Sequence, residues 1–173
     1  MFIGSQLHAN ATSWGKVAET VRCMDDGPWH SAWVPDHFVP PLDFLNEADD
    51  NFEGWTLLTA MAAITERVRL GVLVAGNTYR DPALLAKMAA TLDHVSDGRL
   101  EFGIGAGWHV REHEAYGWYF PPLKERSDRL EEACALIKAL FTADGPVDYK
   151  GQYYHLDAAP FAPGCVQQPH VPI

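Results

Sequence analysis

The sequence of 173 residues is short of basic side chains, of cysteine and of long apolar runs, and each shortage excludes a class of protein. Lys and Arg number 13 against 23 Asp and Glu, which gives a formal net charge of -10. Nucleic acids and anionic membranes bind basic surfaces, so we expect neither as a partner and expect a small-molecule substrate instead. No apolar run approaches the roughly 18 residues of a transmembrane helix, and the first residues lack a signal-peptide pattern. We therefore expect a cytoplasmic protein.

The three cysteines are Cys23, Cys134 and Cys165, widely spaced and without a CxxC pair. This spacing indicates neither a disulfide framework nor a zinc knuckle. Hydrophobic residues make up 47% of the chain and charged residues 21%, as in ordinary soluble globular proteins. One compact domain over residues 1–173 is expected from this length.

Strand-like and helix-like segments alternate along the chain. Short apolar runs predict strands at residues 2–7, 31–34, 70–75 and 100–105. Apolar residues at helical spacing predict helices at 14–24, 55–68, 82–94 and 124–141. Thr12 or Ser13 is expected to cap the first helix and Asp81 the third. The Pro- and Gly-rich remainder from residue 144 is expected to be a surface excursion.

Alternating strands and helices predict a parallel α/β architecture, either an open doubly wound sheet or a (β/α)₈ barrel. The spacing of the apolar residues fits both architectures and does not distinguish between them. A complete barrel takes at least roughly 200 residues, so four βα units in this chain would fill about half of one.

Three segments resemble luciferase-like monooxygenases: WVPDHF at 33–38, the long segment at 70–108, and RSDRLEEACALIKALF at 126–141. The most similar branch uses the deazaflavin coenzyme F420. The resemblance implies a TIM (β/α)₈ barrel of the luciferase-like type, of which this chain is the N-terminal part with about the first four βα units. Because a half-barrel leaves strand edges exposed, we expect a homodimer or a missing C-terminal half to cover them.

Barrel active sites lie at the carboxyl ends of the strands, where the Asp36-His37 pair follows the second predicted strand. In related deazaflavin enzymes this Asp contacts the cofactor, and this His transfers or orients the proton beside the hydride acceptor. The resemblance therefore implies cofactor binding by Asp36 and catalysis by His37. The residues alone also allow Asp36 to cap a loop and His37 to pack there.

The third predicted strand ends in Leu73, Val74, Ala75, Gly76 and Asn77. Related proteins have a non-prolyl cis peptide here, behind the isoalloxazine-like ring, which by alignment is the Leu73-Val74 bond. Leu73, Val74, Gly76 and Asn77 are therefore expected to bind the cofactor. An ordinary strand followed by a polar loop is the alternative.

Glycines at 103, 105 and 107 form GxGxG and not the dinucleotide fingerprint GxGxxG, because position 108 is Trp108. In the resembling family this turn lies against the cofactor, which implies binding by Ala106, Gly107 and Trp108. Tight turn packing without a ligand is the alternative. His8 and His109, at two strand ends, are expected in the substrate pocket.

His109, Glu112 and His113 spell HxxEH, a spacing that binds zinc when it lies on a helix. The motif follows a Gly-rich strand end, and no convincing further ligand is present. We expect a solvated helix start here and no metal.

The resulting hypothesis is an F420-dependent oxidoreductase that transfers a hydride between the deazaflavin and a small organic substrate. The nearest alternative keeps the fold and uses FMN and oxygen as a monooxygenase. An alternative of another class is a non-catalytic half-barrel that acts in oligomerisation or regulation.

Overall fold

The computed structural model describes residues 2–41, 46 and 48–173. Its main sheet has four parallel strands in sequential order: β1 (Gly4–Gln6), β2 (Ser31–Val34), β3 (Arg69–Gly76) and β4 (Leu100–Gly105). The strands are joined by α1 (Trp14–Asp26), α2 (Gly54–Ala62) and α3 (Pro82–Val95), and β4 is followed by α4 (Val110–Tyr116) and α5 (Leu123–Phe141). The predicted α/β class with four βα units is confirmed. None of the helices within these residues is long and apolar enough to cross a membrane.

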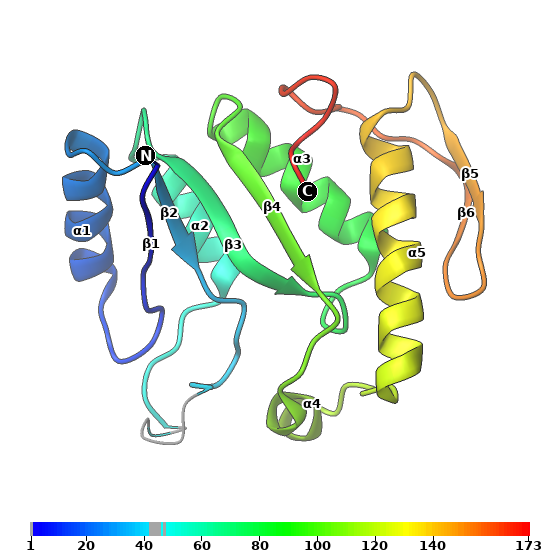
Figure 1. Ribbon diagram of the computed structural model, residues 1–173, viewed down its shortest axis with the longest axis horizontal. Coiled ribbons are helices and arrows are strands. Elements are labelled where there is room, and N and C mark those ends of the chain that lie inside the picture. Colours follow the sequence, from blue (N-terminus) through cyan, green and yellow to red (C-terminus); the bar gives the residue numbers. More distant parts are fainter. Residues whose placement is uncertain (1, 42–45, 47) are drawn as a thin grey trace.

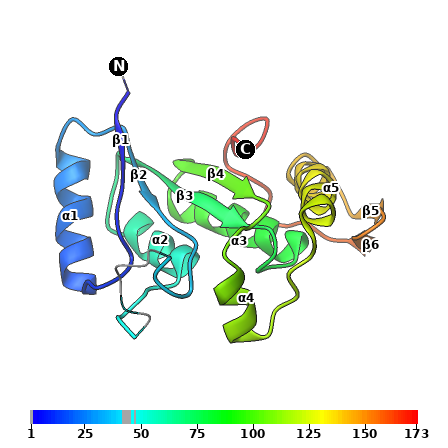
Figure 2. The ribbon, with the colours of Figure 1, turned by 60° about the horizontal axis from the view of Figure 1, so that its bottom comes forward.

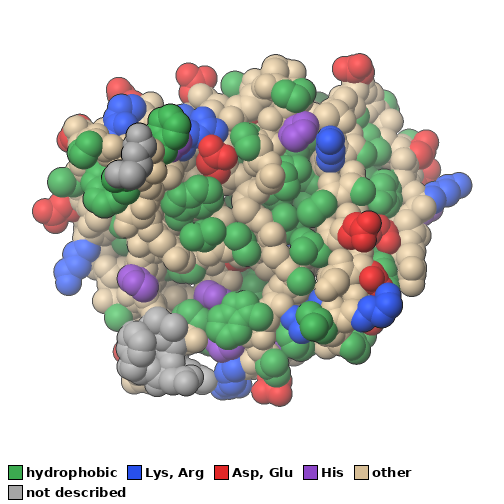
Figure 3. All heavy atoms as spheres, viewed as in Figure 1, with side chains coloured by type: hydrophobic (Ala, Val, Ile, Leu, Met, Phe, Trp, Pro, Cys, Tyr) green, Lys and Arg blue, Asp and Glu red, His purple; other side chains and the backbone are tan. Residues whose placement is uncertain are grey.

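Helices α2 and α3 pack on one face of the sheet, behind it in Figure 1 and beneath it in Figure 2. The core between them includes Trp55, Leu58, Leu70 and Leu85, each at most 2% exposed. Each such burial contributes roughly 1.5–3 kcal/mol. The opposite face is turned toward the viewer in Figure 3, where hydrophobic side chains gather over the middle of the sheet.

The predicted elements agree with the observed boundaries to within two residues, except at the end of α2, which the spacing extended over residues 55–68. The helix ends at Ala62 because the following backbone has other partners. The Asp25 carboxylate accepts from the amides of residues 66–68, and the Arg99 guanidinium donates to the carbonyls of Ala62, Thr65 and Val68. These contacts come from elsewhere in the chain and outweigh the local helical pattern.

The segment from residue 144 is more ordered than a surface excursion. It begins with an antiparallel hairpin of β5 (Val147–Lys150) and β6 (His155–Ala159), which lies beyond α5 in Figure 1. The chain then returns to the sheet, where Val171 is fully buried and the Phe102 amide donates to the Pro172 carbonyl at 2.9 Å. The surface prediction is wrong for these last residues, which pack beside β4.

Candidate active site

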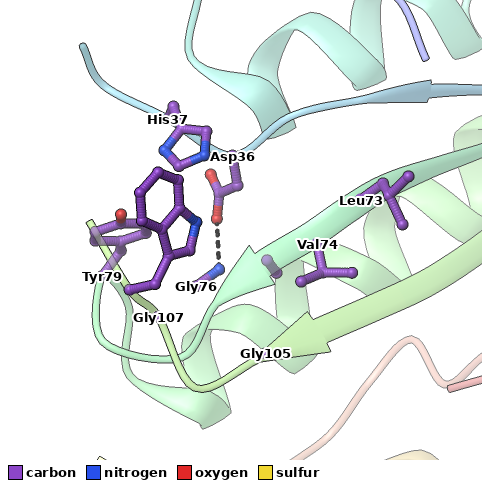
Figure 4. A pocket seen from close by; sticks show the side chains of 10 residues that line it. Asp36, His37, Leu73, Val74, Gly76, Tyr79, Gly105 and Gly107 are labelled. Carbon is purple, nitrogen blue, oxygen red and sulfur yellow. Dashed lines mark hydrogen bonds between the residues drawn. The ribbon is translucent and has the colours of Figure 1, made fainter. Parts of the chain in front are cut away.

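A cavity of about 250 Å³ is lined by residues at and just after the ends of β2, β3 and β4. These strands run toward the bottom of Figure 1. Figure 4 shows its lining, which consists of Asp36, His37, Leu73, Val74, Ala75, Gly76, Tyr79, Gly105, Gly107 and Trp108. All but Ala75, Tyr79 and Gly105 are residues that the sequence analysis expected to bind the cofactor or to act in catalysis. The carboxyl ends of parallel strands meet at one edge of a sheet, which brings these separate segments together.

Four candidates lie outside this lining: His8, Asn77, Ala106 and His109. The Asn77 side chain points to the neighbouring hairpin, where its Nδ2 donates to the Tyr154 hydroxyl at 3.2 Å. His109 stacks on Trp108 with ring centroids 4.9 Å apart, so it supports the cavity wall. Ligand contacts by these four residues stay predictions.

Asp36 is 3% exposed, and both of its carboxylate oxygens have partners. The Arg80 guanidinium donates to them in a bidentate pair at 2.8 and 3.0 Å. The Gly76 amide donates to Oδ2 at 2.9 Å, and this bond is the dashed line in Figure 4. Burial raises the pKa of the Asp36 carboxyl, and the Arg80 guanidinium opposes that shift. The carboxylate thus fixes the end of β3 to the end of β2.

The His37 imidazole faces a second buried carboxylate, that of Glu112 in α4. His37 Nδ1 lies 3.1 Å from Glu112 Oε2 and 3.2 Å from Oε1. Because a carboxylate only accepts hydrogen bonds, Nδ1 carries the proton in this pair. The other ring nitrogen, Nε2, is then left to exchange a proton with a molecule in the cavity that His37 lines.

Glu112 is fully buried and holds several donors at once. Its Oε1 accepts from the amides of Phe38 at 2.5 Å and Val39 at 3.1 Å, and its Oε2 accepts from the Tyr79 hydroxyl. Burial alone raises the pKa of Glu112, but the hydrogen bonds from His37 and Tyr79 outweigh it and lower the pKa to about 2. Burial and the Glu112 charge raise the pKa of Tyr79. Glu112 is therefore ionised and Tyr79 neutral at physiological pH.

The cavity floor is the end of β3, where the Leu73-Val74 peptide bond is cis, as the resemblance implied. Leu73 and Val74 are 49% and 42% exposed, so they present apolar surface to the cavity. A Cβ atom at Gly105 would lie 2.9 Å from Val74 Cγ2, and one at Gly103 would lie 2.4 Å from the Val72 carbonyl oxygen. Glycine at these two positions lets β4 lie close to the floor.

The HxxEH segment is not the solvated helix start that the sequence predicted, because Glu112 and His113 are 0% and 1% exposed. His113 Nε2 lies 2.8 Å from Thr78 Oγ1, and its Nδ1 lies 2.9 Å from the His109 carbonyl oxygen. Both ring nitrogens therefore have partners other than Glu112. Sequence reasoning missed the role of Glu112 beside His37 because 75 residues separate the two.

The model of the luciferase-like monooxygenase family matches residues 1–173. This chain belongs to that family. Among its relatives, an F420-dependent glucose-6-phosphate dehydrogenase of Amycolatopsis mediterranei is 38% identical over 143 residues, covering 81% of this luciferase-like chain and 41% of that protein. Pyrimidine monooxygenase RutA of Escherichia coli is 35% identical over 130 residues, covering 72% and 33%.

Among solved structures, an F420-dependent secondary alcohol dehydrogenase in complex with an F420-acetone adduct superposes with a TM-score of 0.87 at 26% identity. The match covers 99% of this luciferase-like chain and 50% of that one. The chain thus spans half or less of the length of these relatives. The luciferase-like barrel fold is confirmed, with about half of the barrel in this chain.

Proposed function

We propose that this chain forms part of an F420-dependent oxidoreductase, which transfers a hydride between the deazaflavin and a small organic substrate such as an alcohol. The observation that carries the proposal is the His37 imidazole at the cavity, oriented by the buried carboxylate of Glu112. The choice of cofactor is supported by the relatives whose names specify F420.

The lining of the cavity fits a flat ring system. Leu73 and Val74 offer an apolar floor, and the glycines at 105 and 107 keep the adjacent turn free of side chains. Coenzyme F420 would supply the carbon that gains or loses the hydride, while the protein orients the reactants and handles the proton.

His37 is the proposed acid-base group. With its Nδ1 proton directed to Glu112, the neutral imidazole has a free lone pair on Nε2. Nε2 would accept the hydroxyl proton of an alcohol as the hydride leaves, and would return it in the reverse direction. The Glu112 carboxylate would stabilise the imidazolium so formed.

The proposed contribution of Asp36 is mainly to position the floor. A carboxylate has about four acceptor sites, and Arg80 and the Gly76 amide use three of them. The remaining site is available to a donor on the cofactor. Direct contact between Asp36 and the cofactor is part of the proposal.

The test is a titration of this chain with F420 and with FMN under the same conditions, followed by cofactor fluorescence. Selective binding of F420 is expected. A Gly105→Leu variant should lose binding because its side chain enters the cavity, whereas Gly145→Leu, where an added Cβ meets nothing within 4 Å, should retain it. Binding of neither cofactor to this chain, alongside binding by a longer chain that carries the second half of the barrel, would favour a non-catalytic half-barrel. Binding of neither cofactor to the longer chain would contradict the proposal.

A second candidate is a monooxygenase that uses FMN. Its monooxygenase activity is favoured by the 35% identity to pyrimidine monooxygenase RutA. It would use the same floor and the same His37. Tighter binding of FMN than of F420, together with turnover that consumes oxygen, would select this alternative.

A further inference from the structure

Three side chains from two separate segments bring ligand atoms together beside the cavity. His37 follows β2, His109 precedes α4, and Glu112 lies in α4. One ligand atom of each lies within 4.8 Å of the others. Two imidazoles and one carboxylate are a donor set that binds divalent transition metals in proteins.

Two of the three separations within this cluster are close to those between the ligands of a tetrahedral zinc site. Zinc lies about 2.0–2.1 Å from imidazole nitrogen and about 2.0–2.2 Å from carboxylate oxygen, so tetrahedral ligands are about 3.3 Å apart. Glu112 Oε2 lies 3.1 Å from His37 Nδ1 and 3.4 Å from His109 Nδ1. All three ligand atoms lie within 4.8 Å of one another.

His109 Nδ1 is a buried nitrogen without a hydrogen-bond partner among the described residues. Its 3.4 Å separation from Glu112 Oε2 is within ion-pair range, but the geometry is not that of a hydrogen bond. A buried polar atom without a partner is costly. A cation between the three groups would give this nitrogen a partner.

The carboxylate is held in place by neighbours that would remain when a metal is bound. The amides of Phe38 and Val39 donate to Oε1, and the Tyr79 hydroxyl donates to Oε2. Such outer contacts orient metal ligands and raise metal affinity. His113 does not belong to the cluster, because both of its ring nitrogens are engaged with Thr78 and a backbone carbonyl.

We propose that His37 Nδ1, His109 Nδ1 and Glu112 Oε2 form a binding site for Zn²⁺, with a fourth position left to water. The site differs from the helical HxxEH motif because its second imidazole is His37, from the β2 end, and not His113. No single segment of the sequence contains this ligand set.

Zinc at this site would block the proposed acid-base role of His37, and this consequence rests on the proposed function. A neutral imidazole carries one N–H. Once Nδ1 is bound to zinc, that proton must lie on Nε2, which can then donate but not accept. The bound ion would thus inhibit alcohol oxidation without entering the cavity where the cofactor is proposed to bind.

Metal binding is tested directly by titrating this chain with Co²⁺ and then displacing it with Zn²⁺. Tetrahedral cobalt with nitrogen and oxygen ligands absorbs visible light far more strongly than hydrated cobalt, so the spectrum reports the geometry. We expect one equivalent of tetrahedral Co²⁺, displaced by Zn²⁺. His109→Ala should weaken binding at least about 10-fold, and Tyr79→Phe about 10-fold.

The matched control is His155→Ala, because His155 is exposed in β6 and far along the chain from the cluster. Its metal affinity should equal that of the unmodified chain. Circular dichroism establishes that each variant is folded. Equal affinity of the folded His109→Ala and His155→Ala variants, or an octahedral cobalt spectrum, would overturn the site.

The regulatory consequence has a separate readout. F420 binding is measured first in the presence of a chelator, and its failure would count against the proposed function while leaving the cobalt titration interpretable. Where F420 binds and turnover is measurable, Zn²⁺ should inhibit the unmodified protein and should inhibit His109→Ala only at a concentration at least about 10-fold higher. If the same concentration of Zn²⁺ inhibited the unmodified protein and His109→Ala equally, the proposed inhibition through this site would be overturned.

Discussion

The two ends of the parallel sheet both gather charged side chains, but they use them in different ways. At the amino ends of the strands, Arg67 and Arg99 donate mainly to backbone carbonyls. Arg67 reaches the carbonyls of Met24, Asp25, Gly27 and Trp29, and Arg99 reaches those of Ala62, Thr65, Val68 and Ser96. These guanidinium groups join the loops that precede β2, β3 and β4.

At the carboxyl ends, charged side chains face other side chains around a cavity. Asp36 pairs with Arg80, and Glu112 binds His37 and Tyr79. These groups hold one imidazole in a defined orientation at the cavity. Barrels commonly separate stability at one end of the strands from chemistry at the other, and the proposed role of His37 would give the two ends of this sheet the same division.

The sharpest test of this division is His37→Asn. The Asn amide keeps a donor toward Glu112, but it has no counterpart of Nε2. Turnover in the proposed reaction should fall at least about 100-fold, whereas F420 affinity and melting temperature should change little. Steady-state kinetics and cofactor fluorescence measure the two effects, with His155→Asn as the control. Unchanged turnover would remove His37 from the chemistry.

Arg99→Ala, at the amino ends of the strands, is expected to lower stability and to leave cofactor binding unchanged. Loss of the guanidinium leaves several backbone carbonyls without a donor, which should lower the free energy of unfolding by about 3 kcal/mol. At a temperature where the variant is folded, its affinity for F420 should equal that of the unmodified chain. Urea denaturation measures the change. The exposed Lys124→Ala variant, which breaks a surface ion pair with Asp128, should leave the urea midpoint unchanged.

A smaller loss of stability is expected for Gly107→Ala at the turn after β4. Gly107 has φ +77°, and a Cβ atom there would lie 2.5 Å from Thr78 Oγ1. The left-handed backbone alone costs about 1–2 kcal/mol for a residue with a Cβ. Thermal unfolding compares this variant with Gly145→Ala, whose added methyl group meets no neighbour within 4 Å. Equal melting temperatures would show that the turn tolerates a side chain.

The smallest change in stability is expected when Asp25 is replaced. Its carboxylate accepts hydrogen bonds from three amides just before β3. Burial raises the pKa of Asp25, but these backbone hydrogen bonds outweigh it, so the pKa lies below its ordinary value of 3.8. A carboxyl group whose pKa is lower in the folded protein stabilises the fold above its unfolded pKa. This contribution is lost as the pH falls through the folded value.

Asp25→Asn should therefore destabilise the protein near neutral pH by more than it does in acid below that pKa. Urea midpoints of the variant and of the unmodified chain, measured at both pH values, give the comparison. A difference between the two proteins that does not change with pH would contradict this role of Asp25.

Local sequence patterns placed most of the elements correctly. Ser13 caps α1, Asp81 caps α3, and the predicted bounds of β2 and β4 agree with the structure. Capping side chains and continuous aliphatic runs act within a few residues, which is why a sequence can reveal them. The helical pattern after Ala62 failed because Asp25 and Arg99, distant in sequence, bind the backbone that would have continued α2.

The sequence by itself determined the order of the βα units, the family resemblance, and the strand ends on which Asp36, His37 and Val74 lie. Only the tertiary structure decided which of these side chains have partners. Glu112 reaches His37 across 75 residues, and Arg80 reaches Asp36 across 44, because the ends of neighbouring parallel strands and their following loops converge at one edge of the sheet. Convergence of that kind depends on strand pairing and packing, and no local spacing encodes it.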